Sequence, residues 1–99
     1  MAKLFDSPQM RETIRRIIRS RMAFKGMEYK DLVIALEQLG VSQNESNLRS
    51  KVNNGSLGAQ LFVYLLMATD TRALEMDQVR EVLADIERQK GAESSDSAF

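Results

Sequence analysis

Residues 42–55 read SQNESNLRSKVNNG, and this stretch decides how the rest of the chain is interpreted. On a helical wheel of about 100° per residue, Leu48 and Val52 fall on one side. The opposite side holds amide and hydroxyl groups without a carboxylate, on Gln43, Ser46, Asn47, Ser50 and Asn54. The pattern predicts a helix over residues 43–54 that packs through its aliphatic side and presents a polar face.

This helix has clear start and stop signals. Ser42, with Glu45 three residues later, matches a capping box, in which the serine accepts a backbone N–H and the glutamate reaches back. Asn54-Gly55 suits the positive φ at which helices end. We therefore expect Ser42 to cap the helix and Gly55 to follow it.

Two further helices are predicted before this one. Ser7 can cap the first helix, and Pro8 can take its first position. That helix is expected to end near Phe24, with an apolar arc formed by Met10, Ile14, Ile17, Ile18 and Met22. The second is expected from Tyr29 to about Leu39, and its inner stripe is Leu32, Leu36 and Leu39.

Arg21 stands out because it falls within the apolar arc of the first helix. A charged group there is expected to bend outward, to pair elsewhere or to contact a ligand. An arginine whose stem packs at the edge of the core is the simplest structural interpretation.

The sequence pattern in the second half of the chain predicts two more helices. Residues 57–68 are apolar on almost every side, so we expect that helix to be the central pillar of the core. A fifth helix is expected to run to about Lys90, followed by a small, polar, acidic tail over residues 91–99 that is expected to be disordered. The predicted fold is an all-α five-helix bundle forming one domain over residues 1–90.

Composition excludes several classes of function. The 99 residues include no cysteine and no histidine, which removes disulfides, thiolate metal sites and the commonest catalytic base. Glu81 and Asp85 are a carboxylate pair that we interpret as part of a solvated face. We therefore expect no catalytic residue, no metal site and no cofactor, and the protein is not expected to be an enzyme.

No apolar run approaches the roughly 18 residues of a membrane span. Met1 to Phe5 also lacks the apolar region of a secretory signal. The expectation is a soluble cytoplasmic protein that does not associate with a membrane.

The two halves of the chain differ in charge although the net charge is zero. Residues 1–56 hold 10 basic and 6 acidic residues, whereas residues 57–99 hold 4 basic and 8 acidic ones. The basic half contains the polar helix. Charge asymmetry of this kind suggests contact with nucleic acid, although chance placement of solvated charges explains it equally well.

At these residues the chain resembles the phage-repressor-like helix-turn-helix family of the Cro and C1 type. The resemblance covers Ile14 to Asp70 and rests on a helix pair, an Asn-Gly-ended third helix and an apolar fourth helix. The chain is still more similar to a small bacterial domain family of uncharacterised function, through Asn47-Leu48-Arg49-x-Lys51-Val52-x-x-Gly55 and residues 61–67. The resemblance to the phage-repressor-like family implies a five-helix bundle of that type. It also implies that the protein is a bacterial or phage transcriptional regulator of the repressor type.

The chain departs from the repressors in three places. The second helix with its turn, residues 32–42, is about two residues longer than is typical, and Leu48 and Val52 are spaced by four rather than three. The repressors pair an arginine of the first helix with a glutamate before the closing Asn-Gly. Here Arg21 and Asn53 take those places, so an ion pair is not expected.

The hypothesis for function is that helix 43–54 enters the major groove of double-stranded DNA. Side-chain amides can make two hydrogen bonds to an adenine edge, which makes Gln43 and Asn47 the leading base readers. The full set of predicted base contacts is Gln43, Asn44, Ser46, Asn47 and Ser50. The predicted phosphate contacts are Tyr29, Lys30, Arg49, Lys51, Asn54 and Ser56.

A domain this small needs two copies for operator specificity, so a homodimer is expected. The candidate seam is the 3-4-3 stripe of the fifth helix, formed by Met76, Val79, Leu83 and Ile86. Packing of this stripe on the first and fourth helices of the same chain is an equal alternative. The alternative function is a protein-interaction module or an antitoxin-like adaptor that binds a partner protein.

Overall fold

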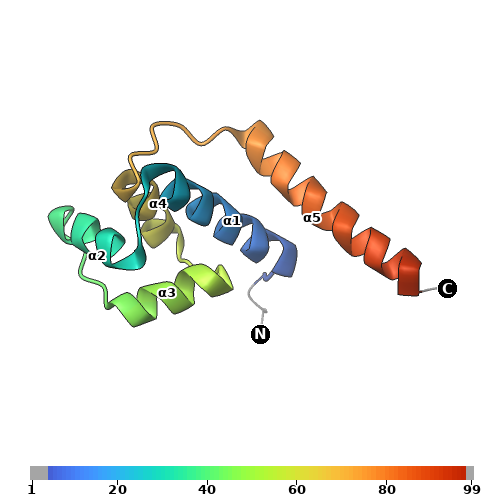
Figure 1. Cartoon of the computed structure of the whole chain (residues 1–99), viewed down its shortest axis with the longest axis horizontal. Coiled ribbons are helices and arrows are strands. Elements are labelled where there is room, and N and C mark those ends of the chain that lie inside the picture. Colours follow the sequence, from blue (N-terminus) through green and yellow to red (C-terminus); the bar gives the residue numbers. More distant parts are fainter. Residues whose placement is uncertain (1–4, 98–99) are drawn as a thin grey trace.

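The computed structural model describes the backbone of residues 5–97 and the side chains of residues 5–90. Over these residues the chain is all-helical, without a strand, as the sequence predicts. The helices are α1 (Pro8–Lys25), α2 (Tyr29–Gln38), α3 (Glu45–Asn54), α4 (Ala59–Ala68) and α5 (Met76–Ser97) (Figure 1). None of these helices is long and apolar enough to cross a membrane, and this statement covers the described residues only.

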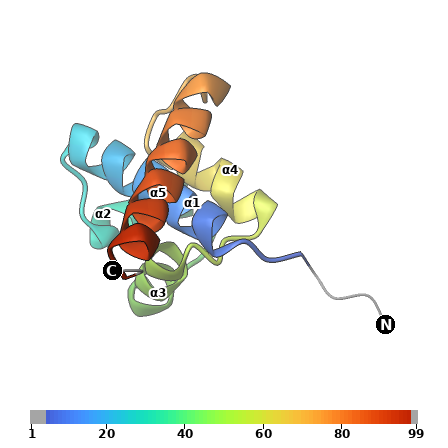
Figure 2. The same ribbon diagram turned by 90° about the vertical axis from the view of Figure 1, so that its right-hand side faces the viewer.

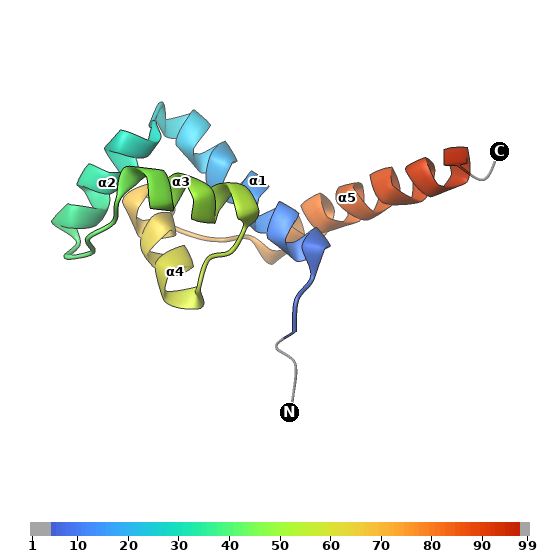
Figure 3. The ribbon, with the colours of Figure 1, turned by 90° about the horizontal axis from the view of Figure 1, so that it is seen from below.

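The main core lies between the first four helices. Its buried members come from all four: Ile18, Met22, Leu32, Leu36, Leu48, Val52 and Leu65. α1 contacts α3 and α4, and α2 contacts the same two helices, so α1 and α2 together support both. Figure 3 shows α3 along the near side of the molecule with no other helix in front of it.

The predicted start of α1 is confirmed. The Ser7 hydroxyl accepts the Met10 backbone N–H at 3.1 Å, and Pro8 occupies the first turn, where its missing N–H has no cost. Gly26 then ends the helix in the left-handed conformation, with φ of 65°. Local sequence signals are sufficient here because all of the contacts lie within a few residues.

The predicted cap of α3 is wrong by two residues. Asn44, not Ser42, caps the helix, and its Oδ1 accepts the Asn47 backbone N–H at 3.1 Å. Asparagine is as good an N-cap as serine, and capping by the later residue leaves more chain to join α2 to α3. Ser42 and Gln43 therefore precede the helix. The stop at Asn54-Gly55 is confirmed, because Gly55 has φ of 63°.

The expectation that α4 forms the central pillar is also wrong. Leu65 is fully buried, but Val63 and Met67 are each 53% exposed and Tyr64 is 37% exposed. α4 contacts only α1 and α2 among the described helices, because α5 does not return to cover it. An apolar sequence allows a helix to be buried on all sides. Whether other helices actually cover all of its sides depends on the path of the chain.

α5 packs along α1 and contacts no other helix of the described part. Val79 on α5 and Ile17 on α1 are buried, and neither belongs to the main core. Figures 1 and 2 show α5 lying against α1 and extending away from the other helices. The helix continues past the predicted end at Lys90 to Ser97, so it includes most of the segment expected to be a disordered tail. Residues 98–99 of that tail lie outside the described residues.

Candidate functional site

The outer face of α3 has the character that the sequence predicts. Ser46, Asn47, Ser50 and Asn54 are exposed. Within the described residues, no side chain of these four makes an intramolecular hydrogen bond. Leu48 and Val52 on the opposite side are fully buried and hold the helix against the core. The face therefore presents amide and hydroxyl groups whose donors and acceptors are available to a partner.

Gln43 and Asn44 lie differently from the other predicted base contacts. Asn44 uses its Oδ1 to cap α3, which leaves its NH₂ group as the available donor. Gln43 is half-buried, and its Oε1 accepts a hydrogen bond from Lys51 Nζ at 3.3 Å. The structure therefore brings Ser46, Asn47 and Ser50 together on one helical face and leaves Gln43 and Asn44 before the helix.

The predicted phosphate contacts come from the start of α2, from α3 and from the connection that follows α3. Arg49, Lys51, Asn54, Ser56 and Lys30 are exposed. Arg49 pairs weakly with Glu45 at 3.7 Å, whereas Lys30 pairs with Glu28 at 3.2 Å. The Glu28 carboxylate raises the pKa of Lys30. Each pair is exposed and so contributes little to stability, which leaves these cations free to exchange partners.

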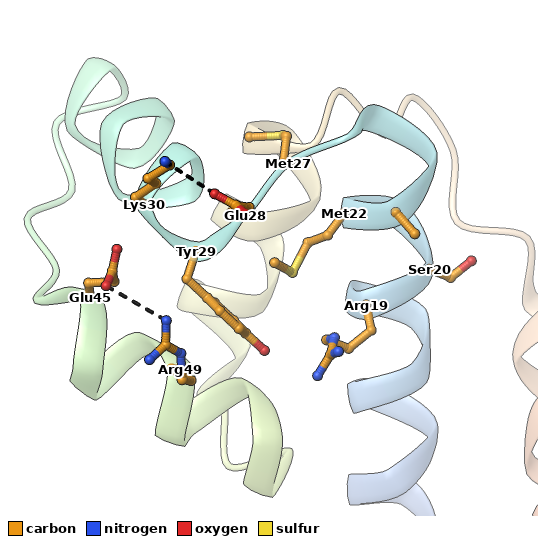
Figure 4. Close-up of a pocket in the computed structure, with 10 residues that line it drawn as sticks. Arg19, Ser20, Met22, Met27, Glu28, Tyr29, Lys30, Glu45 and Arg49 are labelled. Carbon is orange, nitrogen blue, oxygen red and sulfur yellow. Dashed lines mark ion pairs between the residues drawn. The ribbon is translucent and has the colours of Figure 1, made fainter.

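Tyr29 is half-buried between two guanidinium groups from different helices (Figure 4). Arg49 Cζ lies 5.2 Å from the ring centroid and Arg19 Cζ lies 6.0 Å from it, both within the range of cation–π attraction. The Tyr29 hydroxyl donates to Asn53 Oδ1 at 3.2 Å. The first residue of α2 is thereby tied to both α1 and α3.

Arg19 is the member of this cluster that sequence reasoning missed. Its Nη1 donates to Asn53 Oδ1 at 3.2 Å, so the same amide oxygen accepts from α1 and from Tyr29. The link between the first helix and residue 53 thus exists, but Arg19 forms it instead of Arg21. A usable signal is that Arg19 lies about 60° from the buried Met22 on the wheel, at the edge of the core face.

Arg21 pairs elsewhere, which is one of the three outcomes that the sequence left open. Its Nε donates to Thr71 Oγ1 at 2.8 Å, and its Nη2 donates to the backbone oxygens of Thr69 and Asp70 at 3.4 and 3.3 Å. The guanidinium also lies 5.2 Å from the Phe24 ring centroid. Arg21 therefore holds the connection between α4 and α5 against α1.

The remaining arginines of α1 are partly neutralised within the helix. Glu12 pairs with Arg15 at 2.6 Å and with Arg16 at 3.1 Å. The hydrogen bond from Arg15, helped by Arg16, lowers the pKa of Glu12 from 4.5 to about 2 although burial opposes the shift. α1 and α3 each contain one acidic residue that pairs with arginine in the same helix, but the Glu12 pairs are closer than the Glu45–Arg49 pair at 3.7 Å.

The stripe proposed for dimerisation is used in part within the chain. Val79 is 8% exposed, Leu83 and Ile86 are half-buried, and α5 contacts α1. Met76 is the exception, because it is 53% exposed. Of the two alternatives for this stripe, the structure favours packing on the chain's own α1, while the expected packing on α4 does not occur within the described residues.

Comparison of the chain with curated proteins and with solved structures gives no match. A family model described as a domain of unknown function, DUF6471, matches residues 10–74, which span most of α1, all of α2, α3 and α4, and most of the connection that follows α4. The match covers more than half of the chain, and the protein therefore belongs to the DUF6471 family.

Proposed function

We propose that this protein is a cytoplasmic, sequence-specific regulator of transcription, of the repressor type, that binds double-stranded DNA through α3. In this proposal α2 and α3 act as a helix-turn-helix, and α3 lies in the major groove. The observation that carries the proposal is the exposed face of Ser46, Asn47, Ser50 and Asn54, whose polar groups have no intramolecular partner among the described residues.

Asn47 is the leading base reader. It lies near the start of α3, its side chain is exposed, and its amide can donate to and accept from an adenine edge at once. Ser46 and Ser50 can contact bases or phosphates beside it. Gln43 can join them if its hydrogen bond with Lys51 exchanges for one with DNA.

The cations around α3 supply the affinity that does not depend on sequence. Lys51, Arg49 and Lys30 are exposed, and in this proposal they contact phosphates. Asn54 and Ser56 add hydrogen-bond donors, and Tyr29 can add its hydroxyl if that group exchanges its hydrogen bond with Asn53 for one with DNA. Contacts with phosphates fix the position of a protein on the duplex, whereas contacts with base edges select the sequence. Operator specificity would require two copies of the chain.

The test begins with selection of bound duplexes from a randomised DNA pool, together with the promoter region of the protein's own gene. Affinity for the selected duplex is then measured by fluorescence anisotropy over a range of salt concentrations. Asn47→Ala should weaken binding to the selected sequence by about tenfold or more and should relax base preference at one position. Lys51→Ala should weaken binding to all duplexes and reduce the salt slope by about 1.

Matched controls lie outside the α3 face. Gln78→Ala removes an exposed amide from α5, and Arg72→Ala removes an exposed positive charge from the connection before α5. Neither should change base preference. Selection that yields no preferred sequence, or full affinity in both α3 variants, would rule out the groove model.

A protein-interaction module or antitoxin-like adaptor is the second candidate. The observation in its favour is the exposed apolar side of α4, which carries Val63, Tyr64 and Met67. A module of this type should bind DNA weakly and without sequence preference. The salt series therefore separates the two functions.

A further inference from the structure

The outward side of α4 has the spacing of a helix that packs against another helix. Gln60, Val63, Tyr64 and Met67 are exposed at positions i, i+3, i+4 and i+7. Together with Ala59, these side chains line a shallow and mostly apolar hollow. The opposite side of α4 is already packed through Leu65. The helix therefore has two contact stripes, and the described part of the chain covers only one of them.

This stripe is also uncharged, which is unusual on this protein. α4 reads AQLFVYLLMA and contains no ionisable group except the tyrosine phenol, whereas 28% of the whole chain is charged. A partner that presents acidic or basic groups would gain no ion pair here and would lose hydration. The chemistry that fits the stripe is another neutral, apolar helix face.

We propose that α4 packs against α4 of a second copy of this chain, about a two-fold axis. A two-fold contact places the same patch on both sides of the interface, so the patch must be complementary to itself. A patch whose charges are all of one sign fails this condition because like charges meet across the axis. The α4 stripe satisfies it, with bulky Val63, Tyr64 and Met67 beside the small Ala59.

The dimer is expected to be weak. A stable interface usually involves about 20–30 residues on each side, and this stripe offers far fewer. We expect dissociation constants in the range of about 10 μM to 1 mM. The inference does not depend on DNA binding, and its test is carried out without DNA.

Cysteine crosslinking suits a weak dimer, and the chain has no cysteine of its own. Single thiols are introduced on the α4 stripe by Gln60→Cys, Val63→Cys and Met67→Cys in the full chain. Ile34→Cys on α2 and Met76→Cys on α5 are matched controls, because the native side chains are 55% and 53% exposed. A short bis-maleimide reagent is added at about 100 μM protein, a concentration within the range expected for dissociation.

At least one α4 thiol should form covalent dimer at least tenfold faster than the thiol at position 34. Equal rates at all positions would overturn the inference. So would fastest crosslinking at position 76, because that result would place the seam on α5. Dimer formation through α4 in a chain that binds no DNA would support the inference and would overturn only the proposed function.

A charge introduced at the seam provides a second, independent variant. Val63→Glu in the Met67→Cys chain places like charges across the axis and should slow crosslinking at least fivefold. Ile34→Glu in the same chain should leave the rate unchanged. Thermal unfolding followed by circular dichroism checks that both chains remain folded. A rate that Val63→Glu does not change in a folded chain would contradict the two-fold contact.

Discussion

α3 and α4 are consecutive helices of ten residues each that attach to the same core and differ in what they expose. α3 is fixed by Leu48 and Val52, and α4 by Leu65 with half-buried neighbours. Away from the core, α3 presents amides and hydroxyls, whereas α4 presents aliphatic and aromatic groups. The core contacts of both helices account for the fold, so their exposed faces determine which partners each helix can bind.

The two exposed faces have different energetic consequences in water. Polar side chains on α3 remain hydrated at little cost, and they can exchange water for another polar partner. The apolar area exposed on α4 is different, because covering it with a partner would gain about 25 cal/mol of free energy for each Å² removed from water. These physical differences match a polar partner to α3 and an apolar partner to α4.

The largest expected effect comes from Gly55, which separates the two helices. A Cβ at this position would overlap the backbone carbonyl of Arg11, and the residue has φ of +63°. Neither backbone can move aside without disturbing the core, so Gly55→Ala should destabilise the fold by more than about 4 kcal/mol. Urea unfolding followed by circular dichroism measures the change.

Gly40→Ala is the matched control for that variant. Gly40 also has positive φ, +84°, but nothing lies within 4 Å of an added Cβ. Only the cost of the left-handed conformation remains, about 1–2 kcal/mol. Equal losses at both positions would mean that the close approach of Gly55 to α1 does not matter.

The next effect compares the two sides of α4. Leu65→Ala removes a fully buried side chain and should cost about 3 kcal/mol, because a cavity remains in the core. Met67→Ala removes a side chain that is 53% exposed and should cost less than about 0.5 kcal/mol in dilute solution. A large loss for Met67→Ala in the monomer would show that this side of α4 is covered within the chain.

The smallest effect concerns α1, where Glu12 pairs with Arg15 and Arg16 at 2.6 and 3.1 Å, closer than the 3.7 Å between Glu45 and Arg49 on α3. The pKa of Glu12 is about 2 in the fold against an ordinary value of 4.5. Its stabilising contribution is therefore complete above pH 4.5 and is lost as the pH falls toward 2. Glu12 is partly exposed, so this contribution should be below about 1 kcal/mol.

Urea unfolding at pH 7, 4.5 and 2.5 measures this contribution as the difference in stability between the native chain and Glu12→Gln. The difference should shrink as the pH falls. Asp77→Asn, which removes an exposed carboxylate paired with Arg80 on α5, serves as the control for a general effect of charge. A difference that is independent of pH would exclude the Glu12 ion pairs as its source.

Much of the fold is predictable from sequence because its signals are local. Ser7 and Pro8 start α1, Gly26 and Gly55 stop α1 and α3, and apolar spacing marks the buried stripes. The exposed part of the candidate site follows in the same way, because Ser46, Asn47 and Ser50 lie opposite Leu48 and Val52. The cap of α3 is missed because Ser42 and Asn44 are both competent caps, and the length of the preceding connection selects between them.

The contacts of Arg19 and Arg21 show most clearly what cannot be predicted from the sequence. On the wheel they flank the core residues Ile18 and Met22 on opposite shoulders, and nothing in the chain itself says which neighbour lies on which side. In the structure Arg19 meets Asn53 of α3, and Arg21 meets the connection after α4. The sequence by itself determined the start of α1, the stop of α3 and the apolar stripes of α1, α2 and α3, since these depend on contacts within a few residues. Only the tertiary structure decided that α4 keeps an open side and that α5 packs on α1, because both depend on the path of the chain between helices.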